Sequence, residues 1–425
     1  DITSGNATTV YGGNNEGGTV TTSNITTTGG TMTTIYGGNN LDGETKTSNI
    51  TANGGTITTI YGGGNEAETE TTNIDLKAST ISNVYGGGNK AGVTNSTNII
   101  LEGSTVTNNI FGGSNQSGDV DEANIETRSG SAGTIYGGNN LGGETTTANI
   151  TTNGGTITTI YGGGNEANTD TTNIELNSAT IQNVYGGGNK AGIYTSTTIV
   201  QNGSTVSNSI FGGSNQSGTV PVSNITTNGG STANIFGGNN QGGTTTTTNI
   251  TTNSGSVTNI YGGGNEADST TSNITINGLT GTTSNVYGGG NLADATTTNV
   301  LLQGSTTTTI FGGSNESGIV TSSNITTTSG SAATIYGGNN LGGTTTTSNV
   351  TINGGNITTV FGGGNEAITG TTNVDLKAST ITNVYGGGND AGVTNSTNVT
   401  LEGSTVTNLF GGSNQSGDVK ETNID

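Results

Sequence analysis

Apolar residues recur at two phases of a repeating unit, and the first phase follows an asparagine, as in Asn24-Ile25, Asn49-Ile50 and Asn73-Ile74. A small residue stands two positions before each of these aliphatic residues, and Leu, Ile, Thr or Ala commonly stands two positions after it. Because side chains alternate along a strand, these three positions share one face. The pattern therefore predicts a short strand with a narrow buried face.

Charged residues limit that face on one side. They occur four positions before the aliphatic residue, at Lys46, Glu70, Asp121 and Asp170. Burying an unpaired charge is costly, so the buried face is expected to begin after them. The pattern does not decide whether a third short extended segment precedes this strand.

The second apolar phase lies about eleven residues further on, where Ile57 precedes Ile60 and Ile81 precedes Val84. A spacing of three breaks the alternation of a strand, which indicates a bend or bulge between the two aliphatic residues. A helix could also use this spacing, but Thr, Asn, Ser and Gly dominate every unit and are poor helix formers. Each unit is therefore expected to hold two principal strands joined by two corners.

The corner after the second strand has the pattern Tyr/Phe-Gly-Gly-Asn/Gly/Ser-Asn, which occurs seventeen times at intervals of 24 to 26 residues. The steps from Tyr36 to Tyr136, Phe236 and Tyr336 are each 100 residues, so four units form a higher repeat. Self-similarity at a fixed period is typical of a repeat architecture. We expect residues 1–425 to form a single continuous array, part of a longer chain or filament because both ends fall inside a unit.

One unit cannot fold alone. Burying three or four aliphatic side chains contributes about 1.5–3 kcal/mol each, which does not offset backbone ordering at roughly 1–2 kcal/mol for each residue. Stacked units pair their backbones at about 4.8 Å and bring like side chains together in ladders. The predicted fold is all-β, a parallel β-solenoid of about 17 coils of ~25 residues with a four-coil super-repeat of 100 residues.

The corner residues are the principal candidate site. The two glycines, which tolerate positive φ, are expected to turn the backbone, the aromatic ring to stack on its counterparts, and the final asparagine to close the corner. The corner residues singled out are Tyr61, Gly62, Gly63, Asn65, Tyr161, Gly162, Gly163, Asn165, Tyr261, Gly262, Gly263, Asn265, Phe361, Gly362, Gly363 and Asn365. The asparagines before the aliphatic residues are expected to form a second ladder, at Asn49, Asn73, Asn98, Asn124, Asn149 and Asn173.

Composition excludes several function classes. The chain has no Cys and no His, and seven basic residues face 28 acidic ones, for a net charge of −21. No disulfide or thiolate metal site is available, and a basic surface for nucleic acid is absent. No apolar run is long enough to span a membrane. The carboxylates are scattered or repeated and do not form one unique acid–base cluster, so no enzyme activity is predicted.

Three surface functions remain as alternatives. Thr45, Thr47, Asn49 and Thr51, with the equivalent rows from Thr145, Thr245 and Thr345, are expected to face outward, and such Thr-x-Thr ladders resemble those of ice-binding proteins. The same surface could bind glycan. No cofactor is predicted, although calcium held by Asn65, Glu66 and their counterparts is kept as an alternative, in a calcium-stabilised repeat of the surface-layer type.

The Tyr/Phe-Gly-Gly-x-Asn and Thr/Asn-rich repeats resemble those of large bacterial surface proteins with predicted β-solenoids. The resemblance covers the whole chain and implies an extracellular or cell-surface rod, filament shaft or adhesin stalk. Further copies are expected as partners, docked end to end, because the terminal coils of a solenoid have unpaired backbone groups at their open edges. Host or environmental surfaces are further expected partners.

Overall fold

The structure is a computed structural model that describes residues 1–281 and 283–425. The described residues contain thirty strands and no helix. They form a parallel β-solenoid of about 17 coils with a spacing of about 25 residues, which confirms the predicted fold class. The chain divides into two compact units, Asp1–Ser207 with Ser217–Val220 and Asn208–Gln216 with Pro221–Asp425.

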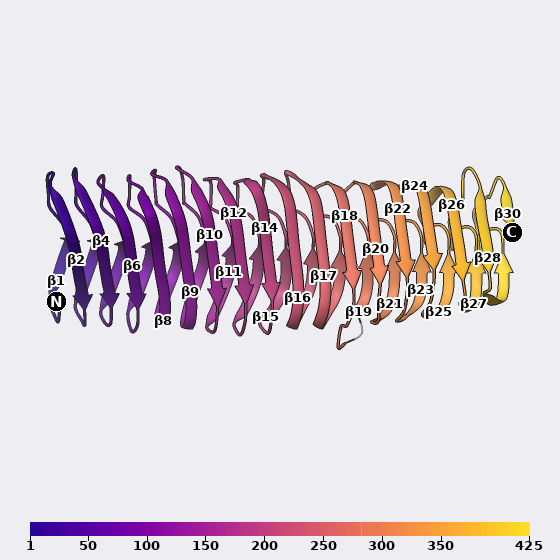
Figure 1. The fold of residues 1–425 in the computed structure, drawn as a ribbon, viewed down its shortest axis with the longest axis horizontal. Coiled ribbons are helices and arrows are strands. Elements are labelled where there is room, and N and C mark those ends of the chain that lie inside the picture. Colours follow the sequence, from indigo (N-terminus) through magenta and orange to yellow (C-terminus); the bar gives the residue numbers. More distant parts are fainter. Residues whose placement is uncertain (282) are drawn as a thin grey trace. The chain divides into compact units, whose positions relative to one another are not determined.

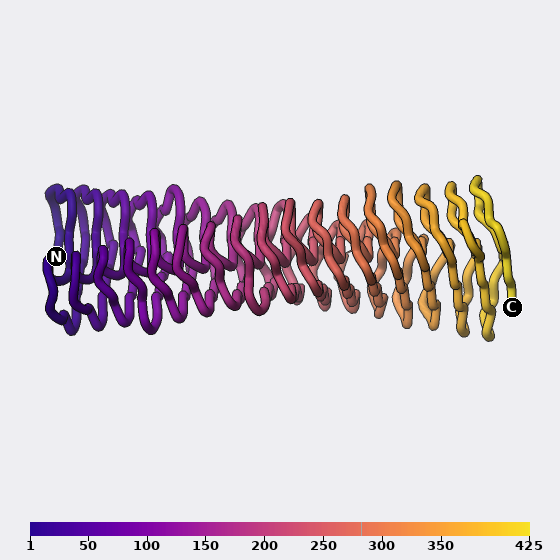
Figure 2. Tube along the Cα trace, turned by 90° about the horizontal axis from the view of Figure 1, so that it is seen from above, coloured from indigo at the N-terminus to yellow at the C-terminus, as the bar shows by residue number. Residues whose placement is uncertain are grey.

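Each complete coil has two strands, such as β4 (Glu44–Ala52) and β5 (Thr56–Tyr61), followed by β6 (Glu68–Leu76) and β7 (Thr80–Tyr85) in the next coil. The first strand pairs only with first strands and the second only with second strands, so β4 lies parallel to β6 and β5 lies parallel to β7. We call the two resulting sheets the asparagine layer and the aromatic layer, after the residues that mark them. In the first unit, coloured indigo to magenta, the strands stand side by side in coil order (Figures 1 and 2).

The remaining strands of the first unit follow the same plan. The asparagine layer also contains β2 (Thr19–Thr27), β10 (Thr145–Thr152), β12 (Thr169–Leu176) and β14 (Ile193–Gln201), and the aromatic layer contains β1 (Asn6–Tyr11), β3 (Thr31–Tyr36), β11 (Thr156–Tyr161) and β13 (Thr180–Tyr185). Strands β8 (Val93–Phe111) and β9 (Val120–Tyr136) continue through the turn between the first and second strands of their coils, so each belongs to both layers. Strands β15 (Thr205–Phe211) and β16 (Thr219–Phe236) hold residues of both units.

The second unit repeats the arrangement. Its asparagine layer contains β18 (Ser269–Ile276), β20 (Ala295–Leu302), β22 (Ile319–Thr327), β24 (Thr344–Ile352), β26 (Ile368–Lys377), β28 (Thr397–Glu402) and β30 (Thr422–Ile424). Its aromatic layer contains β19 (Thr283–Tyr287), β21 (Thr306–Phe311), β23 (Ser331–Tyr336), β25 (Asn356–Phe361), β27 (Thr380–Tyr385) and β29 (Thr405–Phe410), and β17 (Thr244–Tyr261) belongs to both layers.

A thin aliphatic core separates the two layers. In the coil of β4 and β5, Ile50, Ile57 and Ile60 are all buried. Both isoleucines of β5 face inward although they are three residues apart, and the ladder register between β5 and β7 leaves out Thr58 between them. The strand therefore bends at Thr58, as the spacing of the aliphatic residues indicates.

The buried face of the asparagine layer begins earlier than the sequence predicts. Thr45 is completely buried, although it precedes the charged Lys46. The register of β4 with β6 leaves out Lys46, so the strand bends there and both Thr45 and Ser48 point inward. The expectation of an outward Thr45 is therefore wrong, and Thr145, Thr245 and Thr345 are buried in the same way. The segment before the bend belongs to the same strand and forms no third one.

Candidate functional site

The aromatic residue at the end of each second strand stacks on its counterpart in the next coil. The ring centroids of Tyr36 and Tyr61 are 4.8 Å apart with an interplanar angle of 6°, and Tyr61 and Tyr85 are 4.9 Å apart. The predicted corner residues Tyr161, Tyr261 and Phe361 lie in the same kind of stack. Burial of the ring raises the pKa of Tyr61 to about 12, because the phenolate would lose its hydration.

The two glycines after the aromatic residue allow the layers to approach closely. A Cβ on Gly62 would lie 2.2 Å from the carbonyl oxygen of Gly86 in the next coil and 2.9 Å from Cβ of Thr72 in the opposite layer. The hydroxyl of Thr72 in turn donates a hydrogen bond of 2.7 Å to the carbonyl of Gly86. This contact explains why a small residue always stands two positions before the aliphatic residue of the asparagine layer.

These glycines do not use the left-handed conformation that glycine tolerates. None of the glycines at positions 62, 63, 162, 163, 262, 263, 362 and 363 has a positive φ. Positive φ values occur at other turns, for example at Gly43 (83°) and at Gly55 (91°). The glycine pair is therefore required by the space available for a side chain and not by the backbone conformation.

The residue after the glycine pair accounts for the four-coil period. Counted from the coil of Asn39, the four coil types of the super-repeat have Asn, Gly, Gly and Ser at this position. In the first type, Asn139 is completely buried. Its Oδ1 accepts hydrogen bonds from the backbone N–H of Ser114 (2.7 Å) and the hydroxyl of Thr145 (3.2 Å). Its Nδ2 donates to the carbonyls of Gly118 (2.9 Å) and Gly142 (3.1 Å). Asn139 thus links its own turn to the corner of the preceding coil.

The other coil types have residues that fit around this asparagine. Gly64 occupies the position in the second type, where a Cβ would lie 2.4 Å from the carbonyl oxygen of Asn39. Ser114 occupies it in the fourth type, and its hydroxyl donates to the carbonyl of Ala91 at 3.0 Å. The alternation of Asn, Gly and Ser therefore reflects distinct contacts between successive corners.

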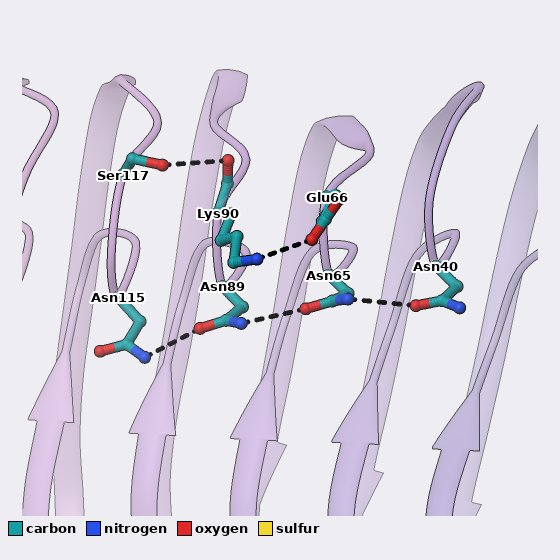
Figure 3. Close-up of polar contacts among 7 residues, drawn as sticks. All are labelled: Asn40, Asn65, Glu66, Asn89, Lys90, Asn115 and Ser117. Atoms are coloured by element: carbon teal, nitrogen blue, oxygen red, sulfur yellow. Dashed lines mark hydrogen bonds and ion pairs between the residues drawn. The ribbon is translucent and has the colours of Figure 1, made fainter.

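The last asparagine of the corner motif forms a ladder along the coils (Figure 3). Nδ2 of Asn65 donates to Oδ1 of Asn40 at 3.1 Å, Asn89 donates to Asn65 at 3.0 Å, and Asn115 donates to Asn89 at 2.9 Å. Asn165, Asn265 and Asn365 each donate to the preceding asparagine in the same way. The sequence predicted that this asparagine closes the corner but did not single it out as a ladder. The signal for the ladder was present, because the asparagine occurs in every coil.

The asparagines before the aliphatic residues form a further ladder on the outer side of the asparagine layer. Asn49 donates to Asn24 at 2.9 Å and Asn73 donates to Asn49 at 2.9 Å. The structure brings the other predicted members into the same row, with donor–acceptor distances of 2.9 to 3.2 Å, at Asn98, Asn124, Asn149 and Asn173. A chain of side-chain amides thus runs along the layer.

Charged residues lie at the surface of the corners and turns. Lys90 Nζ is 2.7 Å from Glu66 Oε1 of the preceding coil, and Lys190 is 3.0 Å from Glu166 (Figure 3 shows the first pair). Solvent-exposed ion pairs of this kind add little to stability. Glu66, a candidate calcium ligand, therefore contacts an ammonium group, and the described residues contain no group of three carboxylates placed to hold a metal ion.

Comparison with known proteins gave no match among protein-family models, curated proteins or solved structures. Within the described residues, no helix has the length and apolar character needed to cross a membrane.

Proposed function

We propose that the chain is a structural shaft, used outside the cell as the rod of a filament or as an adhesin stalk, with no catalytic role. The observation that carries the proposal is the set of parallel ladders that connect each coil to the next. Backbone pairing, stacked aromatic rings and two rows of asparagine amides all run in the same direction within each unit. Bending a unit would strain all of these ladders at once, so each unit should be stiff. Stiffness is the property that a load-bearing shaft needs.

The distribution of residues supports the same role. The interior consists mainly of aliphatic, aromatic, threonine and serine side chains with a few buried amides such as Asn139, and no charged residue is buried among the described residues. The net charge of −21 lies at the surface, where it favours solubility. Resemblance of the repeats to bacterial surface proteins supports an extracellular location.

End-to-end association is part of this proposal. Each coil presents one edge of its strands to the preceding coil and the other edge to the following coil, so the contact is heterologous. A contact of this type that does not close produces a filament. Sedimentation velocity of the purified chain should show linear oligomers that grow with concentration. A monomer at every concentration would contradict end-to-end association.

The location can be tested directly. Gold-labelled antibodies raised against the purified chain should mark filaments or stalks at the surface of the cells that produce it. Labelling confined to the cell interior would contradict the proposed function.

A further inference from the structure

The outer side of the aromatic layer carries no charge in the first unit. Strands β3, β5, β7, β11 and β13 contain no Asp, Glu, Lys or Arg, although the chain has 35 such residues in total. We call the outward residues of four of these strands the threonine face, which consists of Thr31, Thr33, Thr56, Thr58, Thr80, Ser82, Thr156 and Thr158. The residues between them, such as Ile57, point into the core.

Backbone pairing places these side chains in rows. The first row is in register over consecutive coils, from Thr31 to Thr56, Thr80, Thr105, Ser131, Thr156 and Thr180. The second row starts two residues later in each strand. Neighbouring strands are about 4.8 Å apart. The second row lies at the bend of each strand, where Thr33, Thr58 and Ser82 stand between paired positions and so also follow one another from coil to coil. Hydroxyl and methyl groups therefore repeat in two dimensions.

Two features interrupt the rows. Strand β8 has an irregular register with β7 between Val106 and Asn109, and Gly133 stands in the second row of β9. The regular parts of the threonine face are therefore the strands β3, β5 and β7, and the strand β11.

The hydroxyls of the regular parts are open to solvent. Thr56, Thr58, Thr156 and Thr158 are exposed, and within the described part of the chain their hydroxyls have no hydrogen-bond partner. Thr56 and Thr156 are paired with strands on both sides, and Thr58 and Thr158 stand between residues that are paired on both sides. A ligand would thus meet an ordered set of donors and acceptors at little cost in conformational entropy.

The chemistry of this surface favours one class of ligand. Protein partners are bound mainly by aromatic, arginine or other large anchors, and the threonine face has none. Covering its hydroxyls with an apolar surface would leave them without hydrogen bonds, which is unfavourable. Ions find no charge to attract them. A lattice of water molecules, by contrast, can hydrogen-bond every hydroxyl while the methyl groups occupy the gaps between waters.

We propose that the threonine face binds ice, with ordered water at the crystal surface as its ligand. This function is independent of the structural role proposed above. It also differs in location from the ice-binding ladder expected from sequence, because Thr45 and its equivalents in the asparagine layer are buried. The outward rows of that layer are further interrupted by Asp75, Glu126 and Glu175, so it provides a matched control surface.

The test measures inhibition of ice recrystallisation and thermal hysteresis by the full chain. One variant combines Thr56→Lys, Thr58→Lys, Thr156→Lys and Thr158→Lys on the threonine face. The control combines Thr47→Lys, Thr51→Lys, Thr147→Lys and Thr151→Lys on the asparagine layer and adds the same charge. A third variant changes Thr56, Thr58, Thr156 and Thr158 to Ser, which keeps the hydroxyls and removes the methyl groups. Circular dichroism and the melting temperature establish that each variant is folded.

The wild-type chain should inhibit recrystallisation, and the control should match it. The lysine variant should require severalfold more protein for the same effect, and the serine variant should lie between the two. Three results would overturn the proposal: a folded wild-type chain without activity, equal loss in the lysine variant and its control, or side-by-side association of chains that depends on Thr58. The last result would assign the face to a second copy of the chain.

Discussion

At the residue scale, the distance between the two layers depends on glycines that have no unusual backbone conformation. A Cβ on Gly162 would lie 2.2 Å from the carbonyl oxygen of Gly186 and 3.0 Å from Cβ of Thr172. Both neighbours belong to paired strands or their corners and cannot move independently. The glycine pair is therefore needed for close packing of the two layers. Substitution by alanine adds the smallest side chain that can test this requirement.

We predict that Gly162→Ala lowers the free energy of unfolding by about 1–3 kcal/mol, as for overpacked cores. Thr147→Ser, on the outer side of the asparagine layer, should change it by less than about 0.5 kcal/mol. Denaturant unfolding of the two variants beside the wild type provides the measurement. Small, equal effects would mean that the corner can open to accommodate a methyl group.

At the scale of an element, the aromatic ladder should make the fold sensitive to alkali. Burial raises the pKa of Tyr36 to about 12, with further contributions from the neighbouring Tyr61 and Tyr11, and burial likewise raises the pKa of Tyr185 to about 12. In the unfolded chain these hydroxyls ionise near 10.0. Between these values the unfolded state binds fewer protons than the native state, so the free energy of unfolding falls as the pH rises.

We therefore expect stability to be unaffected by these tyrosines below pH 10.0 and to decrease from there to about pH 12. Denaturant unfolding at several alkaline pH values, with phenolate absorbance recorded in parallel, tests this. Tyr36→Phe keeps a stacked ring without an ionisable hydroxyl, as Phe111 does naturally in its coil, and should reduce the alkaline loss. A stability that is constant across this pH range would contradict the buried environment of the rings.

At the scale of the whole molecule, the repeat that must be preserved is four coils and not one. The contacts of Asn139 with Ser114, Gly118 and Thr145 require a particular order of corner types. Stability in stacked repeats is approximately a sum of the repeats and their interfaces. An interface between two corner types that are not neighbours in the natural order should therefore be a local defect. Removal of a complete super-repeat should instead keep the natural order of corner types at every remaining interface.

We predict a difference between two deletions. Removing residues 137–236 joins Tyr136 to Gly237, so that Asn239 takes the place of Asn139. Removing residues 137–161 joins Tyr136 to Gly162, which takes away Asn139 and leaves the buried N–H of Ser114 without its acceptor. Hydrogen exchange should show lost protection at Ser114 only in the shorter deletion, at a local cost of about 1–3 kcal/mol. Equal protection of Ser114 in both would show that the order of corner types is unimportant.

The sequence alone determined the contacts that run along the coils. Each coil lies on a near-copy of itself, so a residue at one phase meets the same phase above and below. The stacking of Tyr36 on Tyr61 and the pairing of Asn49 with Asn73 follow from the repeat length without knowledge of the cross-section. Two apolar phases that alternate with two groups of turn residues predicted two principal strands for each coil, but only the structure decided that no third strand precedes them.

Only the tertiary structure decided which residues face each other across a coil and which side of a strand is buried. The packing of Gly62 against Thr72 joins two layers and has no repeat signal of its own, since both positions recur in every coil. Bends at Lys46 and Thr58 shift the alternation of the strands, and a shift of one residue exchanges the inner and outer faces. For this reason the outward rows of hydroxyls lie on the aromatic layer, while Thr45 of the expected ladder lies in the core.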